Sequence, residues 1–167
     1  MPLEPSRTVC YRPPEQKGKR VLTQLLIGTL ILALTVGVSG IFTLVATQFL
    51  VRMGAWIVRP PHNLRSMIAL VAASLWVQLA VSVSVLLWAI TFRVLGIFEG
   101  MEPAIYFALV SFTTLGFGDV LLPEQWRLLS GFAASNGLLL FGFFTAFLVE
   151  LVRRVRQEQT SGRPDVE

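Results

Sequence analysis

The ten residues SFTTLGFGDV, numbers 111–120, stand between two long apolar stretches and combine a threonine pair with two glycines that one phenylalanine separates. Chemistry at this segment must come from its backbone, because the chain shows no acid–base pair and no nucleophile with a base. Carbonyl oxygens bind a bare cation when successive ones point the same way, which requires alternating left- and right-handed dihedrals. Glycine takes positive φ values at little cost, so Gly116 and Gly118 favour a cation-binding backbone.

The residues beside these glycines have expected roles in such a backbone. Leu115 and Phe117 point backward and wedge the strand against protein, and the hydroxyl of Thr114 adds the innermost oxygens. Non-helical backbone is tolerated at membrane depth only where protein buries it or where it lines a watery cavity. The segment therefore needs a membrane scaffold around it.

The composition supplies this scaffold. Of 167 residues, 54% are hydrophobic and 14% are charged, and the mean hydropathy is +0.67. Residues 21–51, 66–92 and 128–149 carry no charge, and each run exceeds the roughly 20 residues that cross the hydrocarbon core as a helix. The sequence predicts an all-α, multi-pass membrane protein, and an enzyme is not expected.

A short helix is predicted immediately before the glycine segment. Gly100 and Pro103 open the stretch EGMEPAIYFALVSF. Glu102 suits the first turn of a helix, where an acid complements the helix dipole; concentrating cations at the entrance of the ion path is its alternative role. About ten helix-compatible residues, 104–113, follow and are too few to span a bilayer. This predicts a re-entrant half-helix that aims its negative C-terminal end at the ion path.

The motif TTLGFGD resembles the selectivity-filter signature of potassium channels, usually met as Thr-Val-Gly-Tyr-Gly-Asp. The stretch NGLLLFGFFTAF resembles the inner, cavity-lining helix of the same family, and the likeness covers about half of the chain. The resemblance implies a small bacterial-type ion channel with an outer helix, a pore loop and an inner helix, preceded by one extra membrane segment. It implies passive conduction of potassium, which is the permeant ligand, and no cofactor.

The resemblance also assigns residues to this pore. The implied filter residues, called the filter segment below, are Thr114, Leu115, Gly116, Phe117 and Gly118. Potassium ions would be coordinated at Thr114, Leu115, Gly116 and Phe117. The implied supports of the filter are Thr113, Tyr106 and Asp119. Gly137 stands at the place of the gating hinge, and Thr145 at the place of the cavity wall.

Two residues depart from the family pattern. The filter aromatic is Phe117, which lacks a hydroxyl, and Val110 stands where some members carry a glutamate that pairs with the filter aspartate. Tyr106, at the place of a pore-helix tryptophan, is therefore expected to hydrogen bond to Asp119. With two supports missing, the alternatives to a potassium channel are a poorly selective monovalent cation channel and a non-conducting membrane accessory subunit.

The periodicity of the third apolar stretch predicts the residues that line the cavity. At about 100° per residue, one stripe contains Leu138, Phe141 and Thr145. Gly137 lies close to this stripe. Asn136 lies about 180° from Thr145, so its side chain is expected to hydrogen bond to backbone or to Ser111 behind the filter.

The predicted organisation is a chain of membrane segments with polar ends. In order it comprises a polar tail (1–20), a first transmembrane segment (21–51), a basic cytoplasmic linker (52–65), an outer helix (66–98), a pore helix and filter (102–119), an inner helix (124–153) and a cytoplasmic tail (154–167). Residues 66–153 form the pore domain. One chain offers one filter strand and a ring of carbonyls needs four, so a homotetramer is expected.

The charges bear on location and orientation. The net charge of +4 reflects basic residues that flank membrane helices and favour anionic headgroups, so the lipid bilayer is an expected partner and nucleic acid is not. The expected location is the plasma (inner) membrane. With the filter facing outward, a single pass by residues 21–51 places Lys17, Lys19 and Arg20 outside, against the positive-inside rule. The alternative is a break at GVSG, residues 37–40, where the segment turns back.

Overall fold

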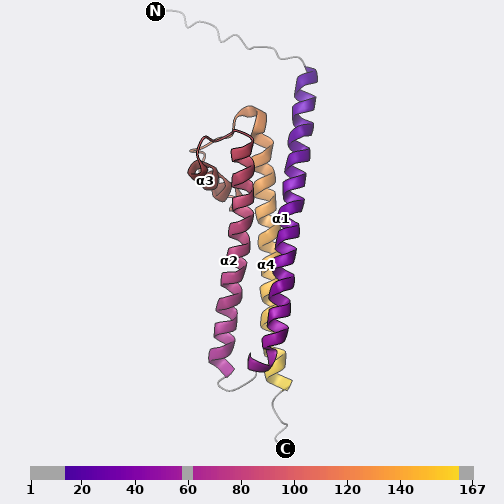
Figure 1. The fold of residues 1–167 in the computed structure, drawn as a ribbon, viewed down its shortest axis with the longest axis vertical. Helices are drawn as coiled ribbons and strands as arrows, with labels where there is room; N and C mark the ends of the chain where they lie inside the picture. Colours follow the sequence, from indigo (N-terminus) through magenta and orange to yellow (C-terminus); the bar gives the residue numbers. More distant parts are fainter. Residues whose placement is uncertain (1–13, 58–61, 162–167) are drawn as a thin grey trace, which may run out of the picture.

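The computed structural model describes residues 14–57 and 62–161, and within these ranges all regular structure is helical. The elements are, in order, α1 (Pro14–Ile57), α2 (His62–Val94), α3 (Met101–Phe112), the 3-10 turn η1 (Glu124–Trp126) and α4 (Arg127–Ser161). The three long helices run side by side, and the short α3 lies beside their upper halves (Figure 1). The all-α prediction is confirmed.

Three helical stretches are long and apolar enough to cross a membrane: Gly18–Phe49, Met67–Val94 and Glu124–Arg154. Helix α3 is apolar but too short to span, as expected of a half-helix. Helix α1 passes through Gly37 and Gly40 without a break, so the alternative of a segment that turns back is wrong. Each glycine costs a helix about 1 kcal/mol, whereas a turn in lipid would leave several backbone groups unsatisfied at several kcal/mol each.

The helices extend beyond the apolar runs that predicted them. Residues 14–20 of the expected polar tail and 52–57 of the expected linker are helical in α1. Likewise, α4 continues to Ser161, inside the expected tail. Apolar content determines which part of a helix lies in lipid, whereas the helix itself continues as long as its backbone hydrogen bonds do. The remaining parts of these segments, 1–13, 58–61 and 162–167, lie outside the described residues.

The outer and inner helices differ from their predicted bounds at the end near the half-helix. Helix α2 begins at His62 and ends at Val94, four residues before the expected end at position 98. Gly96 takes a φ of +67°, a left-handed conformation that ends helices. The inner helix begins with the 3-10 turn η1 and becomes α-helical only at Arg127.

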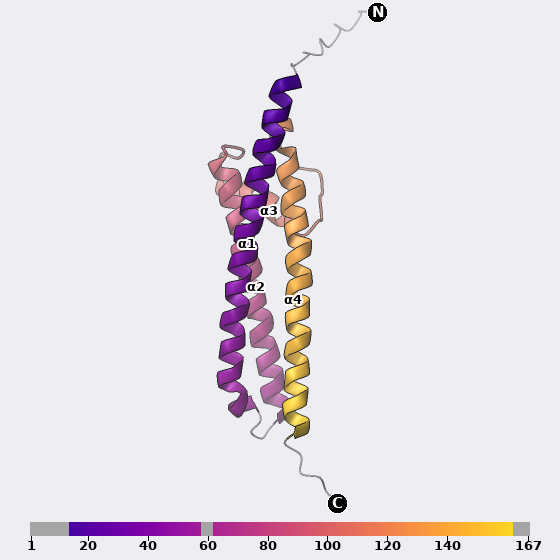
Figure 2. The ribbon, with the colours of Figure 1, turned by 90° about the vertical axis from the view of Figure 1, so that its right-hand side faces the viewer.

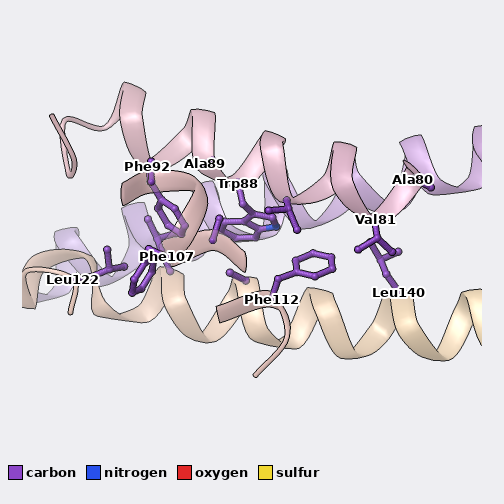
Figure 3. Close-up of a cluster of buried hydrophobic side chains, with 14 of the residues drawn as sticks. Ala80, Val81, Trp88, Ala89, Phe92, Phe107, Phe112, Leu122 and Leu140 are labelled. Carbon is purple, nitrogen blue, oxygen red and sulfur yellow. The ribbon is translucent and has the colours of Figure 1, made fainter. Parts of the chain in front are cut away.

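An aromatic core holds the half-helix between the outer and inner helices. Figure 3 shows Phe107 and Phe112 of α3 lying between α2 and α4, next to Trp88 and Phe92 of α2. The rings of Phe92 and Phe107 meet edge to face with centroids 5.4 Å apart, and Phe112 is fully buried. These contacts fix the direction in which the C-terminal end of α3 points.

Candidate functional site

The end of the half-helix delivers the chain into the filter segment. The backbone N–H of Thr113 donates to the carbonyl of Leu109 at 2.9 Å, and that of Leu115 donates to the carbonyl of Val110 at 3.0 Å. The Thr113 hydroxyl donates to the Leu109 carbonyl at 2.8 Å. The last turn is thereby closed by backbone and side chain, and the role of Thr113 as a filter support stays a prediction.

The filter segment has the alternating backbone that carbonyl alignment requires. Its φ values are +59° at Thr114, +55° at Gly116 and +78° at Gly118, and Leu115 and Phe117 are not among the residues of positive φ. The predicted positive φ at Gly116 and Gly118 is confirmed. Sequence reasoning missed the left-handed Thr114, although the two-residue spacing, continued backward from Gly116, points to it.

The left-handed conformation of Thr114 is costly for a β-branched residue. Non-glycine residues held in this region cost on the order of 1–3 kcal/mol each, and they concentrate at sites where the strain has a use. Thr114 extends the run of positive φ at Gly116 and Gly118 by one more alternate position.

The side chains between the positive-φ residues are not wedged within their own chain. Leu115 is 60% exposed and Phe117 is 68% exposed, so the predicted wedge against protein is not made within one chain and stays a prediction. The reason is that α3 and α4 meet each other directly at Phe112, and the strand runs outside that contact, beside the upper half of α4 (Figure 2). A cavity of about 590 Å³ opens beside the strand and is lined by residues that include Ser111, Ser130 and Arg127.

Asp119 is held at the outer end of the filter segment by the predicted partner. The Tyr106 hydroxyl donates to Asp119 Oδ2 at 2.6 Å, and the backbone N–H of Val120 donates to Oδ1 at 3.0 Å. The predicted contact is confirmed. The hydrogen bond from Tyr106 lowers the pKa of Asp119, and the same bond raises the pKa of Tyr106. The hydrogen bond therefore favours the charged form of Asp119 and the neutral form of Tyr106.

The predicted stripe of α4 lies open in the single chain. Leu138, Phe141 and Thr145 are all exposed. The Phe141 ring meets that of Phe112 with centroids 6.0 Å apart, which places the stripe just below the end of the half-helix. Their predicted role in lining a cavity stays a prediction.

Gly137 lies against the half-helix. It is buried there, and a Cβ built on it would clash with the backbone carbonyl of Phe112. The close approach of two backbones explains this glycine without reference to bending. Its role as a gating hinge stays a prediction.

Asn136 also has a partner that the sequence did not indicate. Its Nδ2 donates to Thr35 Oγ1 of α1 at 2.6 Å, so the expected bond to backbone or Ser111 is wrong. The two residues are 101 positions apart, and an apolar stretch with several hydroxyls carries no signal that selects Thr35. Only the packing of α1 on α4 brings them together.

Residues 80–154 match the model of a family described as an ion channel. The matched region begins within α2, contains the half-helix and the filter segment, and ends within α4. This part of the chain is therefore similar to ion channels, and α1 lies outside the match. Searches of curated proteins and of solved structures returned no match.

Proposed function

We propose that the chain is a subunit of a passive potassium-selective channel in which four copies surround one pore. The observation that carries the proposal is the run of positive φ at Thr114, Gly116 and Gly118 directly after a half-helix. A tight loop between two helices has no need of three left-handed residues at alternate positions. The ion-channel match over residues 80–154 supports the same conclusion.

In this mechanism the backbone replaces the water around the ion. Carbonyl oxygens of the filter segment take the place of the hydration shell of potassium, and several such sites in a row allow one ion to displace the next. The Thr114 hydroxyl adds a further ring of oxygens at the inner end. The C-terminal end of α3 contributes its negative partial charge to the same path. No other ligand is needed for passive conduction.

Four copies follow from what one chain leaves uncovered. Each chain supplies one strand of carbonyls, and closed fourfold symmetry completes the ring. Large apolar side chains are exposed at Leu115 and Phe117 in the filter segment and at Leu138 on α4. Neighbouring chains would cover the first two, and the third would face the central cavity.

The proposed orientation places the filter segment at the outer face of the plasma (inner) membrane. Gln24 Oε1 of α1 accepts a hydrogen bond from the N–H of Leu128, so α1 starts at the same end of the bundle as the filter segment (Figure 1). The exposed Lys19 and Arg20 then lie outside. At the opposite ends of α1 and α4, Arg52 and Arg153 would lie in the cytoplasm, as the positive-inside rule favours.

Flux from potassium-loaded liposomes that contain the purified protein tests the proposal. We expect potassium efflux that needs no energy source, and reversal potentials near the potassium equilibrium value in mixed potassium and sodium. Equal permeation of sodium would favour the poorly selective channel. Two observations favour this alternative: Phe117 lacks a hydroxyl, and the side chain of Asp119 is held by a single tyrosine, Tyr106. The absence of any flux from assembled tetramers would indicate an accessory subunit.

A further inference from the structure

We infer that α1 contributes to ion selection. Through Thr35 and Asn136 it holds the outer half of α4 and thereby positions the filter segment. The inference rests on the proposed channel function and makes Thr35 a positioning residue for ion selection. It concerns a helix that lies outside the region similar to ion channels.

Three contacts attach one face of α1 to the first three turns of α4. Gln24 Oε1 accepts from the N–H of Leu128 at 3.1 Å, which satisfies a free donor at the start of α4. One turn on, Gly28 lets the Phe132 ring approach so closely that a Cβ on this glycine would lie 2.6 Å from it.

The third contact is the hydrogen bond between Thr35 of α1 and Asn136 of α4. The α4 residues of the three contacts stand four positions apart, at 128, 132 and 136, and so form one ridge of the helix. The outer half of α4 is therefore attached to α1 at three successive turns.

The deepest contact is specific, not merely apolar. Thr35 and Asn136 are both fully buried. The Thr35 hydroxyl donates within α1, to the carbonyls of Ile31 and Leu32 at 2.9 Å each, so toward Asn136 it acts as the acceptor. Asn136 Oδ1 has no hydrogen-bond partner among the residues that the structure describes. An amide that is only half satisfied costs folding free energy, and a helix contact that needed packing alone would be better served by an apolar residue.

From Asn136 the contacts lead directly to the filter segment. The next residue, Gly137, lies against the carbonyl of Phe112, the last residue of the half-helix. Thr114, with its left-handed backbone, follows only two positions later. A displacement of the outer half of α4 away from α1 would therefore move the support on which the half-helix ends. Residues in contact are energetically coupled only if a double-mutant cycle measures an interaction free energy between them.

The test uses Thr35→Val in the full-length tetramer, with single-channel and macroscopic currents recorded in planar bilayers. Valine keeps the shape of threonine and removes the acceptor, which leaves the Asn136 amide without its partner. We expect assembled tetramers whose filter inactivates faster, with a roughly 5- to 30-fold shift between conducting and inactivated states, as the loss of one buried hydrogen bond produces. The potassium over sodium permeability ratio should fall in the same variant.

Two further variants separate positioning from general destabilisation. Thr43→Val is the matched control, because the Thr43 hydroxyl donates to the Ser39 carbonyl within α1 at 2.9 Å; its currents should equal those of the parent. The double variant Thr35→Val/Asn136→Leu replaces both polar partners by apolar groups, and its inactivation should return toward the parent. A lowered melting temperature with unchanged inactivation and permeability ratio in Thr35→Val would overturn the inference.

The outcomes distinguish this inference from the proposed function. If the parent protein passes no ions, the proposed function fails. If the parent conducts and Thr35→Val behaves like it, only the role of α1 fails. Should Thr35→Val not assemble, Gln24→Leu carries the same readout, since Gln24 supports the first turn of the same half of α4. Parent-like inactivation in Gln24→Leu would equally overturn the inference.

Discussion

Glycine serves different physical purposes in the filter segment and in the joint beneath it, where α4 packs on the end of the half-helix. In the filter segment, Gly116 and Gly118 have positive φ values, and a Cβ at either would meet no described atom within 4 Å. In the joint, defined here as Phe112, Gly137, Asn136 and Thr35, the glycine lies in ordinary helical backbone and a Cβ would overlap the Phe112 carbonyl. One glycine provides a conformation, and the other provides space.

The two regions also differ in what completes them. The joint is buried within one chain, with Phe112, Asn136 and Thr35 all fully covered. The filter segment is exposed throughout and has only one side-chain anchor in the described structure, Tyr106 to Asp119. Damage to the joint should therefore affect the stability of the subunit as well as the filter that it supports, whereas damage to the filter segment should affect only what four assembled subunits do.

The largest effect is expected for Gly137→Ala. The added methyl group would overlap a backbone carbonyl that cannot rotate away, so α3 and α4 must separate, at about 3 kcal/mol per subunit or more. Thermal and denaturant unfolding of the purified protein in detergent measures this loss, together with the yield of tetramer.

Gly142→Ala is the matched control for this prediction. Gly142 is exposed on the same helix, with room for a Cβ, so alanine should stabilise it by about 0.5–1 kcal/mol. If Gly137→Ala were equally stabilising and lowered only the open probability, Gly137 would act as a hinge alone, and the distinction drawn between the two kinds of glycine would fail.

Gly116→Ala should abolish potassium flux while the tetramer remains assembled. An L-residue at a φ of +55° is strained by about 1–2 kcal/mol, and relaxing it turns one carbonyl out of each strand. Flux from loaded liposomes and size-exclusion chromatography measure the two halves of this prediction. Gly37→Ala, at an exposed position in α1, should leave both unchanged. Normal flux through Gly116→Ala would refute the assignment of the filter segment.

A smaller effect is expected for Tyr106→Phe, which removes the donor to Asp119 and nothing else. The filter segment then loses its side-chain anchor at the outer end, so inactivation should become severalfold faster and preference for potassium over sodium weaker. The unfolding temperature should stay at the parent value, because the pair lies at the surface. Identical currents in mutant and parent would mean that the Val120 N–H alone holds the carboxylate.

The smallest effect concerns pH. The pKa of Asp119 is lowered from 3.8, so its contribution is present above that value and is lost as the pH falls through the lowered pKa. The pKa of Tyr106 is raised from 10.0, so its contribution is present below 10.0 and is lost as the pH rises through the raised pKa.

The current difference between parent and Tyr106→Phe should therefore be flat between about pH 5 and about pH 9. Recording both proteins across a series of external pH values tests this. A difference that titrates near neutral pH would implicate another group at the outer mouth.

Several features of this protein were determined by the sequence alone. Three charge-free runs required membrane-spanning helices, because no other charge-free element of that length satisfies its backbone in lipid. The interval between residues 102 and 113 was too short for a fourth span, which indicated the half-helix. Alternating glycines predicted the left-handed backbone at Gly116 and Gly118. The resemblance to potassium channels, with valine at position 110, implied that Asp119 would bond to Tyr106.

Other features were decided only by the tertiary structure. The packing of Gly137 on Phe112, the bond between Asn136 and Thr35, and the exposure of Leu115 and Phe117 depend on which faces of distant helices meet. In an apolar helix nearly every face can pack, so periodicity does not identify the partner. A local backbone preference is a property of the residue that has it, whereas a contact across 101 positions is a property of the whole packed bundle.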